Sequence, residues 1–217
     1  AGLNILLTSY DSPFFEDELL PAGRLREPAT GKDRANIMIV TKCPDDIKPI
    51  QFNVTTKGVN IQPCQKLFFS KLCYTDLYAM FKSNKIKTLS LSELKEETSV
   101  LLVTGVANPR PLLSKLREYV EEVIPMNFPD HHEFTVDDIK KINTKFEMLP
   151  KDSRLIITTE KDAARLRNHS AMSQAVKKSL FILPIKIGIL QDKQDLFNQT
   201  IIDYVNENKR DSGISAK

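Results

Sequence analysis

The sequence predicts an α/β protein with a mainly parallel sheet flanked by helices in its C-terminal part. Three observations support this fold class. Apolar runs typical of buried strands recur at residues 99–104, 154–159 and 180–185. Segments with apolar residues at helical spacing separate these runs. Strands that alternate with helices form βαβ units, which make the strands parallel and cover both faces of the sheet.

The N-terminal part is predicted to contain further strands. Residues 3–8 and 36–41 are unbroken apolar runs, which suit a parallel sheet covered on both faces. Residues 11–34, between them, contain three prolines and two glycines and are predicted to form a loop. Residues 51–54 and 66–72 are also predicted to be strands.

Capping residues predict two helix starts in the C-terminal part. Asn108 followed by Pro109 is typical of a first turn, since the asparagine side chain accepts from a free backbone N–H. Apolar residues then repeat at helical spacing as far as Val123. Residues 135–138 (TVDD) resemble a capping box. The helix predicted after it carries three apolar residues on one face, Ile139, Ile142 and Phe146.

The other elements follow from the same patterns. A strand is predicted to start at Val123 and to end near Pro125. Residues 161–167 and 191–208 are predicted to be helical. The last helix is expected to face inward through Phe197, Ile201, Tyr204 and Val205. We place the boundary between the two parts of the chain in residues 81–99.

The composition suits a globular protein. The 217 residues are enough for one large domain or two small ones, and 41% are hydrophobic and 27% charged. A formal net charge of +3 is too small to indicate a nucleic-acid partner. No apolar run approaches the length that crosses a bilayer. Three cysteines without a C-x-x-C pair favour a reducing compartment over a disulfide framework or a zinc site.

The chain begins at Ala1 directly in a strand-like run, and no basic secretory leader precedes that run. A natural chain rarely begins in this way, so we expect a processed or engineered fragment.

A small basic cluster has two interpretations. Lys82, Lys85 and Lys87 follow the apolar residues 77–81. They form either the solvated end of a helix or a contact with an anionic membrane surface.

The chemistry is predicted at the carboxyl ends of the parallel strands, where ligands bind in open sheets. Polar residues occupy three such ends, at residues 104–108, 127–132 and 158–162. In a parallel sheet all three lie along one edge. Their convergence predicts a functional site.

The second cluster holds two of the chain's three histidines, His131 and His132, directly after Asp130. A histidine exchanges protons near neutral pH and suits a general base, and a carboxylate holds its ring in one tautomer. The alternative is a loop histidine that caps the helix at Thr135. Adjacent histidines rarely share an ion and no third ligand lies nearby in sequence, so no metal site is predicted.

The third cluster opens a helix. Glu160 and Asp162 complement the positive end of the helix dipole, and Thr159 suits a cap. Lys161 is not explained in this way, because a cation is unfavourable there. It either pairs with Asp130 or contacts a phosphate.

Arg24, Arg26 and Glu27 lie in the loop of the N-terminal part. Guanidinium groups suit phosphate or carboxylate, and Glu27 is able to order an arginine or a metal-bound water. The alternative is a loop whose charges are solvated.

No nucleotide-binding residue is predicted in this chain. The pattern G-x-x-x-x-G-K-[ST] cradles phosphates with backbone N–H groups and a lysine. The pair Gly31 and Lys32 is followed by Asp33, and Arg26 stands where the first glycine is required. No G-x-G-x-x-G occurs either.

Four segments in order resemble motifs of the tetraacyldisaccharide 4'-kinase family. Residues 19–28 (LLPAGRLREP) resemble the family's LLPAGPLREP, with Arg24 in place of proline. Residues 105–109 (GVANP) are similar to GIGNP, with alanine as the third residue. Residues 128–132 (FPDHH) and 159–163 (TEKDA) resemble the family motifs of the same letters. The resemblance covers nearly the whole chain and weakens after about residue 167.

The resemblance implies a kinase that transfers the γ-phosphate of ATP, with Mg²⁺, to the 4'-hydroxyl of a lipid A disaccharide precursor. Such enzymes work at the cytoplasmic face of the bacterial inner membrane. It also implies that a P-loop core precedes this chain, which is then inactive alone. Residues 1–50 would be the remainder of that core, residues 51–97 linking strands and a connector, and residues 98–217 a Rossmann-like lid or substrate domain.

The resemblance further implies that His131, with Asp130 beside it, belongs to an Asp–His pair that activates the hydroxyl. The partner aspartate is expected outside this chain. Arg26 and Glu27 are expected to line the active-site cleft. The same cleft is expected to include Arg24, Asn108, His132, Glu160, Lys161 and Asp162.

Two other functions stay open at this level. One is a non-catalytic α/β module that binds lipid or a protein partner. The other is a different Rossmann-like enzyme that is complete in itself. No oligomeric state is predicted.

Overall fold

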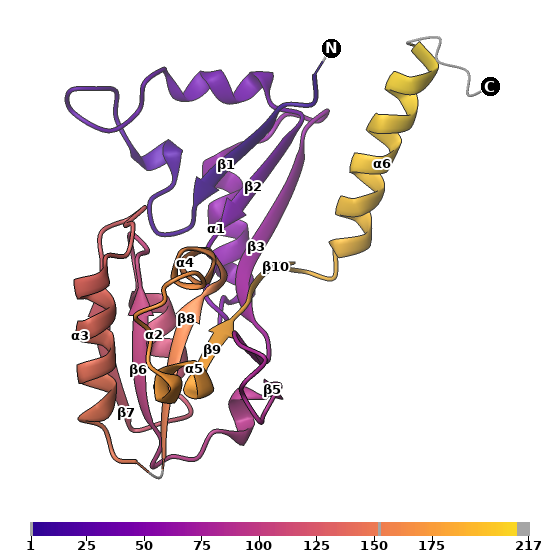
Figure 1. Ribbon diagram of the computed structural model, residues 1–217. Coiled ribbons are helices and arrows are strands. Elements are labelled where there is room, and N and C mark those ends of the chain that lie inside the picture. The colour runs from indigo at the N-terminus through magenta and orange to yellow at the C-terminus, as the bar shows by residue number, and fades with distance from the viewer. Residues whose placement is uncertain (1, 152, 212–217) are drawn as a thin grey trace. The chain divides into compact units, whose positions relative to one another are not determined.

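The structure, a computed structural model, describes residues 2–151 and 153–211 (Figure 1). It divides into two compact units, each with its own sheet. Unit 1 comprises Ala1–Cys73 and Ile187–Lys217, and unit 2 comprises Tyr74–Lys186. These bounds differ from the predicted segments 1–50, 51–97 and 98–217. The last strand and the last helix belong with the N-terminal strands, because they pack on that sheet.

Unit 2 contains a six-stranded sheet in the order β5-β4-β9-β8-β6-β7. Its strands are β4 (Leu77–Ala79), β5 (Thr88–Leu89), β6 (Ser99–Thr104), β7 (Glu122–Asn127), β8 (Arg154–Thr159) and β9 (Leu180–Leu183). The four strands from β9 to β7 are parallel, whereas β4 pairs antiparallel with both β9 and β5. The predicted α/β fold class with a mainly parallel sheet is therefore confirmed.

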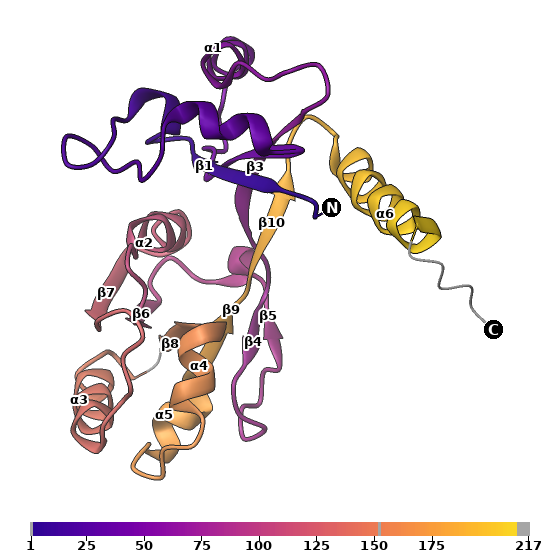
Figure 2. The ribbon, with the colours of Figure 1, turned by 90° about the horizontal axis from the view of Figure 1, so that it is seen from above.

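Helices cover both faces of this sheet (Figure 2). They are α2 (Arg110–Leu116), α3 (Val136–Glu147), α4 (Glu160–Leu166) and α5 (Gln174–Ser179), and the 3-10 turn Leu91–Glu93 joins β5 to β6. Alternate residues of each strand point to opposite faces. On β6, Val100 and Leu102 pack with α2, whereas Leu101 and Val103 pack with α3, α4 and α5. This two-sided burial explains the unbroken apolar runs in the sequence.

Unit 1 contains a four-stranded sheet in the order β1-β2-β3-β10. Its strands are β1 (Ile5–Ser9), β2 (Ile37–Thr41), β3 (Lys66–Tyr74) and β10 (Ile185–Ile189), and its helices are α1 (Pro49–Val59) and α6 (Gln194–Asp211). Two 3-10 turns, Phe14–Glu16 and Ala29–Arg34, lie in the long loop between β1 and β2. Residues of α1 pack with Met38 and Val40, whereas Phe197 and Ile201 of α6 pack with Ile37 and Ile39.

The predicted strand at residues 51–54 is wrong, because these residues belong to α1. Pro49 occupies the first turn, and Gln51 accepts a hydrogen bond from the Lys48 N–H at 2.7 Å. Phe52 then packs edge-on against Phe69 of β3, with ring centroids 4.8 Å apart. A short apolar run fits either structure, so tertiary packing decides it.

The helix predicted as far as Val123 ends at Leu116 instead. Residues 122–127 form β7, and Pro125 lies inside this strand rather than at its end. The strand β7 lies at the edge of the sheet and has a neighbouring strand on one side only. Pro125 is tolerated there, because its missing N–H costs no hydrogen bond on the side without a neighbour.

Two expectations of burial are also wrong. Leu7 in β1 is 61% exposed, because β1 is an edge strand that the described residues cover on one face only. Val205 of α6 is exposed, whereas Phe197 and Ile201 pack inward as predicted.

The predicted capping box at the start of α3 is confirmed. The Thr135 N–H donates to Asp138 Oδ2 at 3.0 Å, and the Asp138 N–H donates to Thr135 Oγ1 at 3.2 Å. The bond from the Thr135 backbone, followed by that from His132, lowers the pKa of Asp138 from 3.8 to about 2. The ionised carboxylate therefore stabilises the fold.

We expect Asp138→Ala to lower the free energy of unfolding by roughly 2 kcal/mol at neutral pH, measured by urea denaturation. The folded pKa lies below the unfolded value of 3.8. This contribution is therefore complete above about pH 4 and is lost as the pH falls toward about 2. Asp137→Ala, at an exposed carboxylate of the same turn, is the control and should cost less than about 0.5 kcal/mol. Equal effects of the two variants would contradict the capping argument.

Candidate functional site

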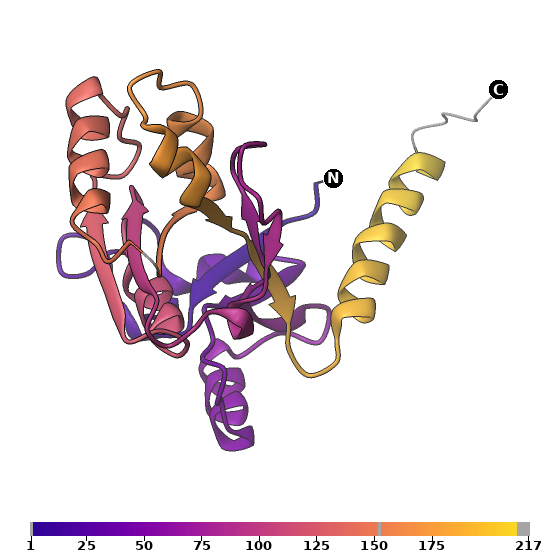
Figure 3. The ribbon, with the colours of Figure 1, turned by 60° about the horizontal axis from the view of Figure 1, so that its bottom comes forward.

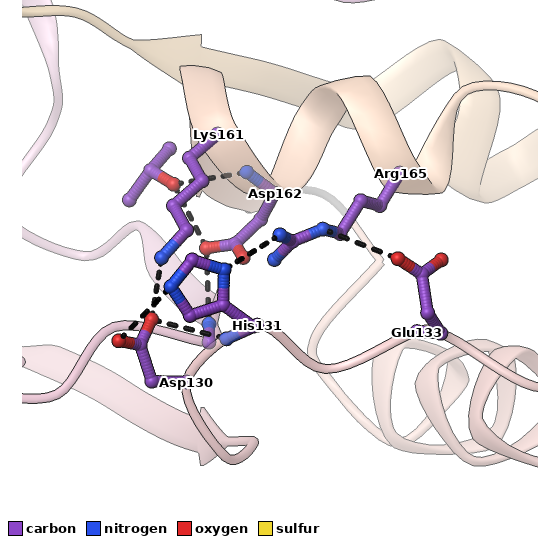
Figure 4. Close-up of polar contacts among 8 residues, drawn as sticks. Asp130, His131, Glu133, Lys161, Asp162 and Arg165 are labelled. Atoms are coloured by element: carbon purple, nitrogen blue, oxygen red, sulfur yellow. Dashed lines mark hydrogen bonds and ion pairs between the residues drawn. The ribbon is translucent and has the colours of Figure 1, made fainter.

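The three polar strand ends lie side by side at one edge of the unit 2 sheet. The strand β6 pairs in parallel with β7 on one side and with β8 on the other. In this register Thr104 lies opposite Asn127, and Val103 lies opposite Thr158. The loops that follow the three strands therefore meet, and side chains from two of them form the cluster in Figure 4. The predicted convergence is confirmed.

Asp162 joins the ends of β6 and β8. Its side chain is fully buried, and its Oδ2 accepts from the Gly105 N–H at 2.9 Å and from the Thr159 hydroxyl at 2.8 Å. Thr159 in turn accepts from the Asp162 N–H and caps α4 as predicted. A Cβ at residue 105 would lie 3.0 Å from Asp162 Oδ1 and 3.1 Å from the Pro129 carbonyl. A side chain at residue 105 would therefore be crowded by groups of both other loops.

Lys161, which follows β8, forms an ion pair with Asp130, which follows β7 (Figure 4). This was one of the two predicted alternatives for Lys161. The hydrogen bond from Lys161, assisted by the charge of His131 and by the His131 backbone N–H, holds the pKa of Asp130 below its usual value. Asp130 is therefore a carboxylate at any pH near neutrality.

His131 is the exposed member of the histidine pair. Its side chain is 74% exposed, and its Nε2 lies 3.7 Å from Asp130 Oδ2. Its backbone has φ of 61°, a left-handed conformation that is uncommon for a residue with a side chain. Arg165 of α4 approaches from the other side, with Nη2 3.3 Å from His131 Nδ1. Arg165 Nε also lies 3.6 Å from Glu133 Oε1.

His132 points into the protein instead. Its Nε2 lies 2.8 Å from Asp138 Oδ2, and because a carboxylate only accepts, Nε2 is the donor. Its ring stacks on Phe128 with centroids 4.9 Å apart and contacts the edge of Phe134. His132 thus does not cap α3 itself, as the alternative predicted, but donates to Asp138, the acid of the capping box.

Two other predicted residues of unit 2 have structural contacts. Asn108 Oδ1 accepts from the Arg110 N–H at 3.1 Å, which satisfies a free donor at the start of α2. The Tyr78 hydroxyl donates to Glu160 Oε1 at 3.4 Å. Burial of the Tyr78 hydroxyl, with the charge of Glu160, raises the pKa of Tyr78.

The predicted residues of unit 1 form ion pairs within their own loop. Arg24 Nε lies 2.9 Å from Asp17 Oδ2, and the hydrogen bond from the Arg24 backbone lowers the pKa of Asp17. Both carboxylate oxygens of Glu27 accept from Arg34 Nη2 at 2.6 Å, and this bond lowers the pKa of Glu27. Glu27 therefore orders an arginine, as one predicted alternative holds. Arg26 is exposed.

Sequence reasoning missed Arg165, Gly105 and Arg34 as partners. Arg165 stands one helical turn after Lys161 and Asp162, so helical spacing on α4 was the available signal. Arg34 follows Glu27 by seven residues in a segment predicted as loop, and no periodic pattern there indicates a contact.

The edge also holds polar atoms with spare hydrogen-bonding capacity. Asp162 Oδ1 and Arg165 Nη1 are buried and have no hydrogen-bond partner among the described residues. Within residues 2–151 and 153–211, no group of three or more His, Cys, Asp or Glu side chains is placed to hold a metal ion.

Comparison with known proteins gives a consistent result. A family model described as tetraacyldisaccharide-1-P 4'-kinase (LpxK) matches residues 1–205. A tetraacyldisaccharide 4'-kinase of Bacteroides thetaiotaomicron is 48% identical over 222 residues, which cover 100% of this chain and 58% of that protein. The protein of the same name from Flavobacterium johnsoniae is 38% identical, covering 96% of this chain and 56% of its own length. The chain thus spans a little over half the length of these curated relatives.

A solved structure has a related fold. The crystal structure of LpxK from Aquifex aeolicus in complex with ATP aligns with a TM-score of 0.52 and 22% sequence identity. The alignment covers 89% of this chain and 50% of the other.

Asp162→Ala should lower the free energy of unfolding by about 2 kcal/mol or more, because the buried Gly105 N–H loses its acceptor. Thermal or urea unfolding followed by circular dichroism measures this change. Glu160→Ala, at an exposed residue of the same turn, is the matched control and should have little effect. A stability loss no greater than in the control would contradict the proposed linkage of the strand ends.

Proposed function

This chain belongs to the tetraacyldisaccharide 4'-kinase family, and from that premise we propose that it is part of a lipid-sugar kinase. The enzyme would transfer a phosphoryl group from ATP to the 4'-hydroxyl of a tetraacyldisaccharide 1-phosphate in lipid A synthesis. The observation that carries the proposal is the exposed His131 beside Asp130, held by Lys161 and Arg165 at the carboxyl edge of a parallel sheet.

In this proposal His131 exchanges a proton with the reacting hydroxyl. A general base needs an imidazole within hydrogen-bond reach of the substrate, and His131 is the accessible histidine of the pair. His132 is excluded from this role by its bond to Asp138 and its stacking on Phe128. The assignment of His131 rather than His132 therefore rests on exposure and contacts.

Asp130 and Lys161 take supporting roles. Ionised Asp130 faces Nε2 of His131 and favours the tautomer that carries its hydrogen there. Lys161 neutralises Asp130 and adds a cation at the edge where an anionic substrate would arrive. Asp162, Asn108 and Glu160 shape this edge through their contacts rather than by touching the substrate.

In unit 1, Arg26 is the residue proposed to contact a phosphate. Its guanidinium is exposed, whereas Arg24 is engaged by Asp17 and Glu27 is engaged by Arg34.

ATP and Mg²⁺ are the cofactors proposed for the whole enzyme. The sequence has no phosphate-binding loop, and the described residues offer no metal cluster. The residues present therefore do not fit either group, and we assign none of them to hold it. We propose that ATP and Mg²⁺ are bound by other parts of a longer protein and that this chain alone does not catalyse the transfer.

We also propose a peripheral contact with an anionic membrane surface, at the cytoplasmic face of the inner membrane. Among the described residues, no helix is long and apolar enough to cross a membrane. The alternative that placed Lys82 at the end of a helix is wrong, because β4 pairs antiparallel with β5 and residues 80–87 form the loop of this hairpin. Lys82, Lys85 and Ile86 are exposed in this loop.

Two further lysines extend this basic surface. Lys177 and Lys178 belong to α5, a helix that lies beside the hairpin (Figure 3), and Lys177 Nζ is 5.9 Å from the Phe81 ring. Lys87 donates to the carbonyls of Lys82 and Asn84 and so stabilises the loop instead. Exposed lysines around an exposed isoleucine suit a surface of anionic headgroups.

His131→Ala in a longer, active protein that contains this sequence should lower kcat about 100-fold, the usual contribution of a general base. Steady-state kinetics with the disaccharide substrate measures this loss. His132→Ala is the comparison and should lower the melting temperature, because it removes a bond to Asp138. An unchanged kcat for His131→Ala would remove His131 from the mechanism.

Lys82→Glu with Lys85→Glu should abolish most binding of this chain to vesicles that contain anionic phospholipid, measured by co-sedimentation. Lys57→Glu with Lys145→Glu changes the net charge equally at exposed helical positions and should leave most binding intact. Equal losses in the two double variants would point to net charge alone and against a specific surface.

A further inference from the structure

Both ring nitrogens of His131 face charged groups of the protein. Nδ1 lies 3.3 Å from Arg165 Nη2, and Nε2 lies 3.7 Å from Asp130 Oδ2 (Figure 4). The ring is 74% exposed, yet neither nitrogen is presented to solvent without a neighbour. These two neighbours therefore bear on which ring nitrogen carries the hydrogen of the neutral His131 ring.

The chemistry of the guanidinium fixes the direction of the first contact. An arginine side chain has only N–H donors and keeps its charge at all accessible pH values. Nδ1 of His131 must then be the acceptor, so it carries no hydrogen while the contact stands. The hydrogen of the neutral ring is on Nε2, on the side of the Asp130 carboxylate.

Neighbouring groups place Arg165 beside His131. Its side chain is only 19% exposed, and Glu133 Oε1 lies 3.6 Å from its Nε. The helix α4 that carries it is joined to the end of β6 through the bond from Gly105 to Asp162. The His131 backbone is also fixed, since its N–H donates to Asp130 Oδ1 at 3.0 Å. Both partners are thus positioned before any substrate arrives.

We propose that Arg165 is a positioning residue for His131, which holds the ring with its hydrogen on Nε2 and occupies the lone pair of Nδ1. Its catalytic meaning rests on the proposed function. With the ring hydrogen on Nε2, beside Asp130, Nδ1 is the nitrogen that can accept a proton from the reacting hydroxyl. It does so only after Arg165 has moved away. Arg165 therefore controls access to the basic nitrogen of His131.

The contact is testable in this chain without any kinase activity. Diethyl pyrocarbonate acylates histidine at a ring nitrogen with a free lone pair, and peptide mass spectrometry gives the rate at each histidine. Arg165→Met should raise the rate at His131 several-fold, because Nδ1 becomes free. The rates at His132 and His169 serve as internal references and should not change. An unchanged rate at His131 would overturn the proposal.

Matched variants separate this effect from loss of charge or of folding. Arg167→Met removes an exposed arginine from the end of the same helix and should leave the His131 rate unchanged. Arg165→Leu also removes every donor and is the second variant if Arg165→Met does not fold. It should raise the His131 rate in the same way, and failure to do so would also count against the proposal.

A spectroscopic readout tests the tautomer itself. Two-bond ¹H–¹⁵N correlation spectra of the neutral His131 ring should show the Nε2–H form alone in the unmodified chain. The Nδ1–H form should become detectable in Arg165→Met. Identical tautomer populations in the two proteins would overturn the assignment, since a purely structural role of Arg165 does not select a tautomer.

These results are independent of whether His131 is catalytic. If His131→Ala leaves kcat of the longer protein unchanged, the proposed function fails, but the acylation and tautomer results still report on Arg165. If Arg165→Met changes neither of these, the positioning role fails even when His131→Ala lowers kcat.

Discussion

A single buried carboxylate, that of Asp162, holds the candidate site together. It accepts from the Gly105 N–H at the end of β6 and from the hydroxyl of Thr159 at the end of β8. Its position on α4 sets the direction of the residues around it. Lys161 reaches Asp130, and Arg165, one turn further on, reaches His131. This link is a polar contact between the loop after β6 and the helix that supplies both cations. The positions of the charged groups at this edge therefore depend on one backbone hydrogen bond, from the Gly105 N–H to Asp162, at a crowded point of the structure.

The two adjacent histidines have opposite environments because the backbone turns between them. His131 adopts a left-handed conformation and stays exposed, whereas His132 packs between Phe128 and Phe134 and donates to Asp138. The capping acid of α3 thus orders His132, and with it the loop that presents His131. His132 thus contributes to the stability of the fold, and the adjacent His131 is proposed to take part in the reaction. This difference explains why substitution of the two histidines is expected to have different consequences.

The two units carry different parts of the proposed function. Unit 2 holds the histidine edge and the basic hairpin, whereas unit 1 holds the loop of Arg24, Arg26 and Glu27. Within that loop Arg24 pairs with Asp17 and Arg34 pairs with Glu27, whereas Arg26 is exposed outside these two ion pairs. The chain spans a little over half the length of its curated relatives. The longer kinase proposed above would have further residues to bind ATP. This sequence itself has no phosphate-binding loop.

The sequence alone determined the fold class, the polar strand ends and the family. Apolar runs of strand length between helical patterns require a covered parallel sheet, and the motifs at residues 128–132 and 159–163 stand at its edge. The capping box at Thr135 was also predictable, because its partners are three residues apart. Only the tertiary structure decided that residues 51–54 are helical, that the last helix joins unit 1, and that Arg165 contacts His131. Local patterns specify local hydrogen bonds, but these three features depend on contacts between residues distant in sequence, whose energies exceed local preference.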